Sequence, residues 1–131
     1  MENLNEIFIE IKKILENQSD GLTARKEVLG SSVKIKKPGF HLYGEEEVSL
    51  FGKKPQQTYV AGVIQQKNYV SFYLMPIYSD PELIEDVIPE LKKYLKGKSC
   101  FNIKKSSKNL LKNVRTVLNN GIQIYKKKKW I

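Results

Sequence analysis

The longest run of apolar, β-branched and aromatic residues lies within residues 58–78 and is interrupted once, by a short polar stretch. Two strands joined by a tight turn have this pattern, because Asn tolerates a positive φ and polar side chains stay solvated in a turn. With Lys67 and Asn68 as a two-residue loop, Val63 pairs with Phe72. The pattern therefore predicts a β-hairpin at the centre of the chain.

This pairing sorts the side chains of the hairpin onto two faces. One face is wholly apolar and carries Ala61, Val63, Val70, Phe72 and Leu74. The other face is amphipathic and carries Val60, Ile64, Tyr69, Ser71, Tyr73 and Met75. We expect the first face to pack on a core, and the second either to be covered or to act as a binding surface.

Helical periodicity predicts a helix near each end of the chain. In residues 3–17, one stripe at helical spacing consists of Leu4, Ile7, Phe8, Ile11 and Leu15. Near the C-terminus, Ser106 or Ser107 is suited to cap a long helix whose apolar residues run from Leu110 to Tyr125 with a period of 3.6.

A third helical region precedes the last strand. Asp80 and Pro81 form a typical helix start, with a capping residue followed by proline at the first helical position. Pro89 interrupts the apolar stripe that follows, and it either kinks this helix or begins a second short one.

Short alternating segments predict the remaining strands. Residues 32–36 and 40–43 alternate apolar and polar side chains and form a predicted hairpin, whereas residues 22–31 are ambiguous. Residues 44–47 are interpreted as a polar connection before a strand-like stretch at 48–51. A last strand is expected near residues 99–104.

Strands grouped between terminal helices and joined by short loops are typical of the α+β class. We predict one domain, residues 1–131, with an antiparallel sheet of about five strands. The N- and C-terminal helices are expected to pack together on one face of the sheet, and a helical insertion precedes the last strand.

Composition agrees with a globular protein, at 40% hydrophobic and 28% charged residues. The sequence has no apolar run of membrane-spanning length and no N-terminal signal pattern. Its one cysteine, Cys100, suits a reducing compartment, so a cytoplasmic location is expected.

The charge distribution is more informative than the net charge of +9, because all 14 acidic residues lie at or before Glu90. The C-terminal part is strongly basic and favours a polyanion, such as nucleic acid, or an acidic protein as partner. The alternative is that the lysines only solvate a helix face. The candidate polyanion-binding residues are Lys108, Lys112, Arg115, Lys126, Lys127, Lys128 and Lys129.

Two local patterns resemble the YdhG-like family of small uncharacterised bacterial domains, which is grouped loosely with frataxin-like and YjbR-like folds. One is the strand at residues 68–73 that runs into Met75 and Pro76; the other is the glycine-lysine turn within residues 95–102. The resemblance covers roughly residues 58–125. It implies an αβα-type domain with an antiparallel sheet, and no established activity.

Enzymatic motifs are absent from the sequence, and we expect a non-enzymatic protein without a cofactor. The single histidine, His41, rules out any site that needs two histidines. Cys100 has lysines nearby in sequence that would lower its pKa, but a structural thiol is the favoured interpretation.

The frataxin-like comparison suggests weak iron binding as an alternative function. Glu2, Glu6 and Glu10 lie four residues apart on one flank of the first helix, and carboxylate oxygens suit hard cations. A second alternative is a small-ligand cleft between sheet and helices, with Tyr59, Tyr78, Phe51 and Met75 as further candidate lining residues. The aromatic residues selected for a cleft or for stacking are Tyr43, Tyr69, Tyr73 and Trp130.

Overall fold

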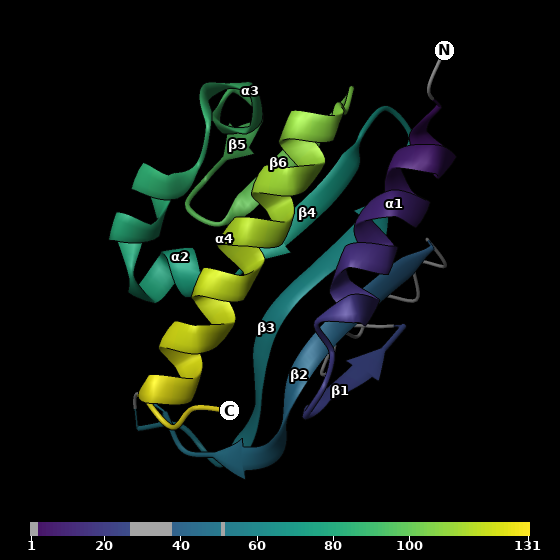
Figure 1. Cartoon of the computed structure of the whole chain (residues 1–131). Helices are drawn as coiled ribbons and strands as arrows, with labels where there is room; N and C mark the ends of the chain where they lie inside the picture. Colours follow the sequence, from purple (N-terminus) through teal and green to yellow (C-terminus); the bar gives the residue numbers. More distant parts are fainter. Residues whose placement is uncertain (1–2, 27–37, 51) are drawn as a thin grey trace.

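Six antiparallel strands form one sheet in the computed structural model of the chain, which describes residues 3–26, 38–50 and 52–131 (Figure 1). The strand order across the sheet is β1-β2-β3-β4-β6-β5. The strands are β1 (Leu22–Arg25), β2 (Gly39–Val48), β3 (Gln56–Gln65), β4 (Val70–Leu74), β5 (Leu95–Lys96) and β6 (Cys100–Ile103). The α+β class and the antiparallel sheet are confirmed, with one strand more than expected.

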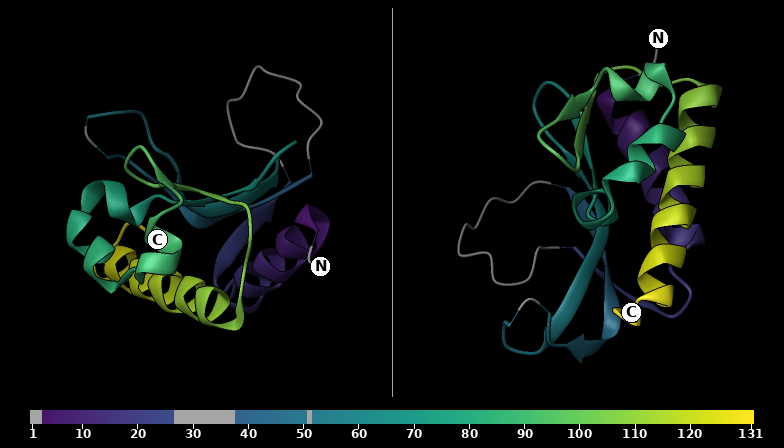
Figure 2. Two further views of the ribbon diagram at one scale, coloured as in Figure 1. Left: turned by 90° about the horizontal axis from the view of Figure 1, so that it is seen from above. Right: turned by 90° about the vertical axis from the view of Figure 1, so that its left-hand side faces the viewer.

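Two long helices cover the same face of the sheet (Figures 1 and 2). Helix α1 (Leu4–Asn17) begins at Asn3, whose side chain accepts a hydrogen bond from the backbone N–H of Glu6. Helix α4 (Lys108–Lys127) begins at Ser107, which caps the backbone N–H of Leu110 in the same way. Such caps typically contribute about 1 kcal/mol each, and they fix where the helices start.

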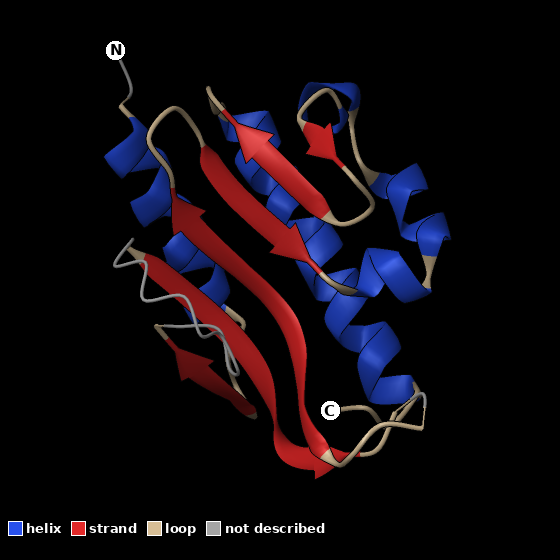
Figure 3. Cartoon of the chain, turned by 180° about the vertical axis from the view of Figure 1, so that it is seen from behind, coloured by secondary structure: helices blue, strands red, loops and turns tan. Residues whose placement is uncertain are grey.

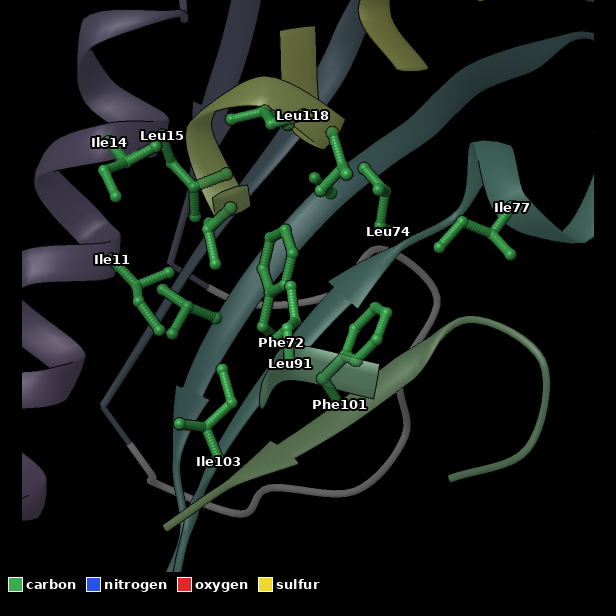
Figure 4. Packing of buried hydrophobic residues seen from close by; sticks show 14 of the residues in the cluster. Ile11, Ile14, Leu15, Phe72, Leu74, Ile77, Leu91, Phe101, Ile103 and Leu118 are labelled. Carbon is green, nitrogen blue, oxygen red and sulfur yellow. The ribbon is translucent and has the colours of Figure 1, made fainter. Parts of the chain in front are cut away.

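The core lies between these helices and the sheet (Figure 4). Ile11 and Leu15 of α1 and Leu118 of α4 reach the strands, where Phe72 and Phe101 are fully buried. The two phenylalanine rings stack with centroids 6.0 Å apart. Packing of the helical stripes against the apolar strand face therefore holds the domain together.

The central hairpin has the pairing that the sequence predicts. Val63 lies opposite Phe72, and Ile64 lies opposite Ser71. The backbone N–H of Gln66 donates to the carbonyl oxygen of Tyr69 at 2.9 Å, which closes the turn. All five residues of the predicted apolar face are buried.

The predicted face of Val60 is wrong. Register shifts interrupt the pairing of β2 with β3 on either side of Tyr43, so the alternation of side chains slips by one residue there. As a result, Val60 and Ala61 are both buried although they are consecutive. Tyr59 lines the cleft on the other face, whereas Val60 belongs to the hydrophobic core.

Between β4 and β5 the chain forms three short helical pieces: α2 (Pro76–Ser79), the 3₁₀ helix η1 (Pro81–Asp86) and α3 (Pro89–Lys92). Pro89 therefore begins a separate helix, which is one of the two outcomes left open by the sequence. Asp80 precedes η1 but makes no side-chain cap. Its carboxylate instead accepts hydrogen bonds from Ser79 and Lys128.

Other boundaries differ from the sequence-based expectations. Residues 44–47, predicted as a connection, belong to β2. The exposed glutamates at 45–47 lie beyond the part of β2 that pairs with β1, so this part of β2 has β3 as its neighbour in the described sheet. The strand predicted at 32–36 lies outside the described residues. In the described part of the chain, β2 pairs with β1 and β3, and β1 comes from the ambiguous segment 22–31.

Candidate functional site

A cleft of about 640 Å³ lies where the sheet, the β2–β3 connection and the C-terminal end of α4 meet. The strands contribute Tyr43, Val48, Gln56, Gln57, Thr58, Tyr59, Ile64 and Tyr73. The connection contributes Leu50 and Lys53. The segment after β4, including α2, contributes Met75, Tyr78 and Ser79. The end of α4 and the turn that follows it contribute Tyr125 and Trp130. The walls therefore come from parts of the chain far apart in sequence.

The sheet face opposite α1 and the start of α4 supplies the tyrosine wall. Figure 3 shows this face, which neither long helix covers. Tyr73 alternates with the buried core residues Phe72 and Leu74, so its ring lies on the cleft side of β4. The register shifts in β2 and β3 bring Tyr59 beside Tyr43, with ring centroids 5.2 Å apart in an edge-on arrangement.

A buried histidine supports this wall. The Nδ1 atom of His41 is 2.9 Å from the hydroxyl oxygen of Tyr59. Burial lowers the pKa of His41 and raises the pKa of Tyr59, so both groups are neutral near pH 7. His41 is only 2% exposed, and its hydrogen bond fixes the position of the tyrosine ring.

Gly62 makes this arrangement possible, because the histidine and tyrosine lie directly over its backbone. A Cβ atom at residue 62 would be 2.1 Å from the Tyr59 hydroxyl and 2.2 Å from His41 Nδ1. Any side chain larger than hydrogen would displace at least one of the two rings.

The end of α4 forms the facing wall. The rings of Tyr125 and Trp130 are 5.2 Å apart, and the backbone N–H of Trp130 donates to the carbonyl oxygen of Tyr125 at 3.0 Å. Lys129 adopts a positive φ of 61°, which turns the chain back toward the sheet. Burial raises the pKa of Tyr125 to about 12.

An ion pair holds this turn in place. Lys128 Nζ lies 2.6 Å from Asp80 Oδ2 and 4.5 Å from the centroid of the Trp130 ring. Partial desolvation raises the pKa of Asp80, but hydrogen bonds from Lys128 and Ser79 outweigh it and leave the pKa below its usual value. Lys128 therefore links the segment after α2 to the wall that Trp130 forms.

Two residues of the lining, Thr58 and Lys53, differ from the aromatic ones because they bring polar groups to the cleft. Thr58 is 8% exposed, and its Oγ1 atom is buried with no hydrogen-bond partner in the described part of the chain. Lys53 is exposed, and it bears the one formal charge among the described residues that line the cleft. The site thus combines a mostly apolar, aromatic lining with a few polar groups, as ligand sites commonly do.

The structure places the sequence-selected aromatic residues unequally. Tyr43, Tyr73 and Trp130 line the cleft, whereas Tyr69 lies at the β3–β4 turn and is not a lining residue. Phe51 lies outside the described residues.

The candidate polyanion-binding residues lie along α4 and the turn that follows it. Lys108, Lys112 and Arg115 are exposed at helical spacings of four and three residues, so they share one side of the helix. Lys126, Lys127, Lys128 and Lys129 are exposed at its other end, where Lys128 is already paired with Asp80.

The candidate iron ligands do not form a described cluster. Glu6 is exposed and Glu10 is partly buried on α1, while Glu2 lies outside the described residues. Within residues 3–26, 38–50 and 52–131, no group of three or more His, Cys, Asp or Glu side chains is arranged to hold a metal ion. Desolvation raises the pKa of Cys100, opposite to the effect that nearby lysines would have.

Sequence reasoning did not select Thr58, Lys53, Ser79 or Tyr125 for the cleft. Tyr125 falls on the apolar stripe of α4, and Thr58 fits the alternation of β3. The sequence therefore explains both residues as parts of the fold, without any role in a site. Only the three-dimensional arrangement brings them together.

Comparisons with protein-family models, with curated proteins and with solved structures each found no match to this chain. The resemblance to the YdhG-like family therefore stays a prediction. Across the described ranges, none of the helices has both the length and the apolar character needed to cross a membrane.

Proposed function

We propose that this protein is a binding module that holds a small, largely apolar molecule in the tyrosine-lined cleft. The observation that carries the proposal is the cleft itself, about 640 Å³ in volume and walled by aromatic side chains from several segments. Ligand sites commonly occupy roughly 300–1,000 Å³ and have such a lining.

The physical basis for binding is burial of ring surface. Tyr and Trp bury large areas, and aromatic pairs add about 0.5–1.5 kcal/mol beyond that burial. The cleft walls are already held by the His41–Tyr59 hydrogen bond and the Lys128–Asp80 ion pair. A ligand would therefore meet a largely preorganised surface, which limits the entropy lost on binding.

The probe for this proposal is 2-naphthamide, a neutral aromatic molecule. Trp130 is the single tryptophan, and Met75 is one of two methionines, so both give simple signals. We expect saturable quenching of Trp130 fluorescence and a saturable shift of the Met75 methyl resonance. Absence of both changes at millimolar probe would overturn the proposal.

A matched pair of variants locates the binding. Ile64 lines the cleft, whereas Ile9 is 40% exposed on α1, which packs on the other face. Ile64→Glu should weaken binding of 2-naphthamide at least tenfold, because it places a charge among the rings. Ile9→Glu should leave binding unchanged. Equal effects of the two variants would show that the probe binds elsewhere or nonspecifically.

Polyanion binding by α4 is a second candidate function. It is favoured by the alignment of Lys108, Lys112 and Arg115 on the exposed side of a helix that contains no acidic residue. Phosphate contacts by such residues are sequence-independent and fall steeply with salt.

A salt titration of binding to mixed-sequence DNA and RNA tests this candidate. We expect the triple variant Lys108→Gln, Lys112→Gln and Arg115→Gln to weaken binding and to reduce the salt slope. A triple change of the uncharged neighbours Asn109, Thr116 and Asn119 to Gln should do neither. Failure of the native protein to bind at low salt would eliminate the candidate.

A further inference from the structure

The charge of the cleft restricts the ligands that it can accept. Lys53 bears the one formal charge among the described lining residues, and its sign is positive. Burial raises the pKa of Tyr59, Tyr73 and Tyr125, so these phenols stay protonated and add no negative charge near pH 7. The charges on the described lining residues themselves therefore favour a negative over a positive ligand.

An acidic residue close in sequence does not offset this preference. Asp80 follows the lining residue Ser79, but its carboxylate is 2.6 Å from Lys128 Nζ. This pairing neutralises the charge that would otherwise repel an anion at that wall.

The orphan hydroxyl of Thr58 is the second indication. Its Oγ1 atom is buried and lacks a hydrogen-bond partner in the described part of the chain, although Thr58 lines the cleft. Native proteins satisfy most buried polar groups, and an unsatisfied one costs about 1–3 kcal/mol. A rotation of the Thr58 side chain toward the cleft would let this hydroxyl donate its one hydrogen bond to an acceptor oxygen on a bound ligand.

The aromatic walls indicate the shape of the rest of the ligand. Tyr43 and Tyr59 meet edge-on with an interplanar angle of 71°, and Tyr125 and Trp130 are inclined at 58°. A flat aromatic molecule suits such a lining, because it can pack on aromatic side chains edge-on or in offset stacks.

We propose that the ligand class of the cleft is the aromatic carboxylates: flat ring systems with a carboxylate whose charge Lys53 compensates and whose oxygen accepts from Thr58. This inference rests on the proposed small-molecule binding and adds the chemistry of the ligand to it.

The charge preference is tested with 2-naphthoate and its neutral analogue 2-naphthamide, by calorimetry on the full chain. We expect naphthoate to bind about three- to fivefold more tightly, which is the size of an exposed charge pair. Lys53→Gln should abolish this preference, whereas Lys54→Gln, at the adjacent exposed lysine outside the lining, should retain it. Higher salt should reduce the preference in the native protein.

The Thr58 contact is tested with the near-isosteric change Thr58→Val. Removing an unpaired buried hydroxyl should leave the free protein equally stable or more stable in urea unfolding. The same change should weaken naphthoate binding about tenfold, because a hydrogen bond to a charged group is lost. A variant that is stabilised yet binds less tightly identifies the hydroxyl as a ligand contact; unchanged naphthoate affinity would overturn this contact.

The two proposals fail in different ways. If neither probe binds, the proposed small-molecule function is wrong. If both probes bind with equal affinity, or if Lys53→Gln leaves the preference intact, the cleft binds small molecules but the assignment of aromatic carboxylates is overturned.

Discussion

The two faces of the sheet use the same strands in opposite ways. Facing α1 and α4, Phe72, Leu74 and Phe101 are completely buried among apolar side chains (Figure 4). On the other face, Tyr59 and Tyr73 carry hydroxyls with pKa values raised by burial, beside a buried histidine. One face has only apolar groups to pack, whereas the other buries polar groups among its aromatic rings.

Within a single strand, side chains on one face therefore stabilise the fold, whereas side chains on the other face line the candidate site. Side chains on the helix-covered face are closely packed against one another, so a change in the size of any of them is costly. The cleft face retains an unpaired hydroxyl at Thr58 and a side-chain-free position at Gly62. Features that lower stability but shape a cavity are more common at binding sites than in cores.

The largest expected effect comes from adjacent residues on opposite faces of β4. Phe72→Ala should lower the free energy of unfolding by about 3–5 kcal/mol, because it leaves a cavity beside Phe101. Tyr73→Ala should cost about 1 kcal/mol, since Tyr73 is only partly buried. Urea unfolding of both variants measures the contrast, and equal losses would show that both faces contribute similarly to the core.

A smaller effect is expected at Gly62, where the cleft face tolerates no side chain. Gly62→Ala should cost about 1–3 kcal/mol, because the new Cβ would displace the Tyr59 hydroxyl or His41. It should also weaken binding of 2-naphthamide, since the tyrosine wall moves.

Gly52→Ala is the control for that change. Gly52 has a φ of 72°, and a Cβ there meets no atom within 4 Å. Its replacement should cost about 1–2 kcal/mol through backbone strain alone and should leave the His41 resonances unchanged. If Gly62→Ala also leaves those resonances unchanged, the close approach of the two rings is not what requires glycine.

Local patterns predicted most of the fold. The alternation in the central hairpin predicted its register, because one face had to be apolar throughout. Asn3 and Ser107 begin helices whose apolar stripes face the sheet, so the cap and the period agree. The short strand β1 was not predicted, because four residues with mixed burial have no distinct period.

Local patterns could not predict the register shifts between β2 and β3 or the cleft. Alternation assigns Val60 to the wrong face, because the register shifts depend on how β2 pairs with β3 and not on either sequence alone. Tyr43, Tyr73 and Trp130 were selected as aromatic residues, but their meeting in one cleft depends on tertiary packing. The orphan state of the Thr58 hydroxyl has no sequence signal at all.

The smallest expected effect concerns the pH dependence of stability. Burial lowers the pKa of His41 below the usual histidine value of about 6.5, so the unfolded chain binds a proton more readily than the folded chain. Stability from this group is therefore complete above about pH 6.5 and is lost as pH falls from there toward the lower folded pKa. Urea unfolding at about pH 7, 6 and 5 should show this decline, and its slope should correspond to the uptake of less than one proton by the chain on unfolding.

His41→Gln isolates the contribution of the cleft face, because His41 is the single histidine of the chain. The glutamine can still hydrogen-bond to the Tyr59 hydroxyl but does not titrate, so the decline between pH 7 and 5 should become shallower. Asp80 does not interfere, because its pKa is lowered from 3.8 and its contribution is lost only at more acidic pH. An identical decline in the native protein and the variant would mean that His41 can be protonated without disturbing Tyr59, and the two faces of the sheet would then respond alike to acid.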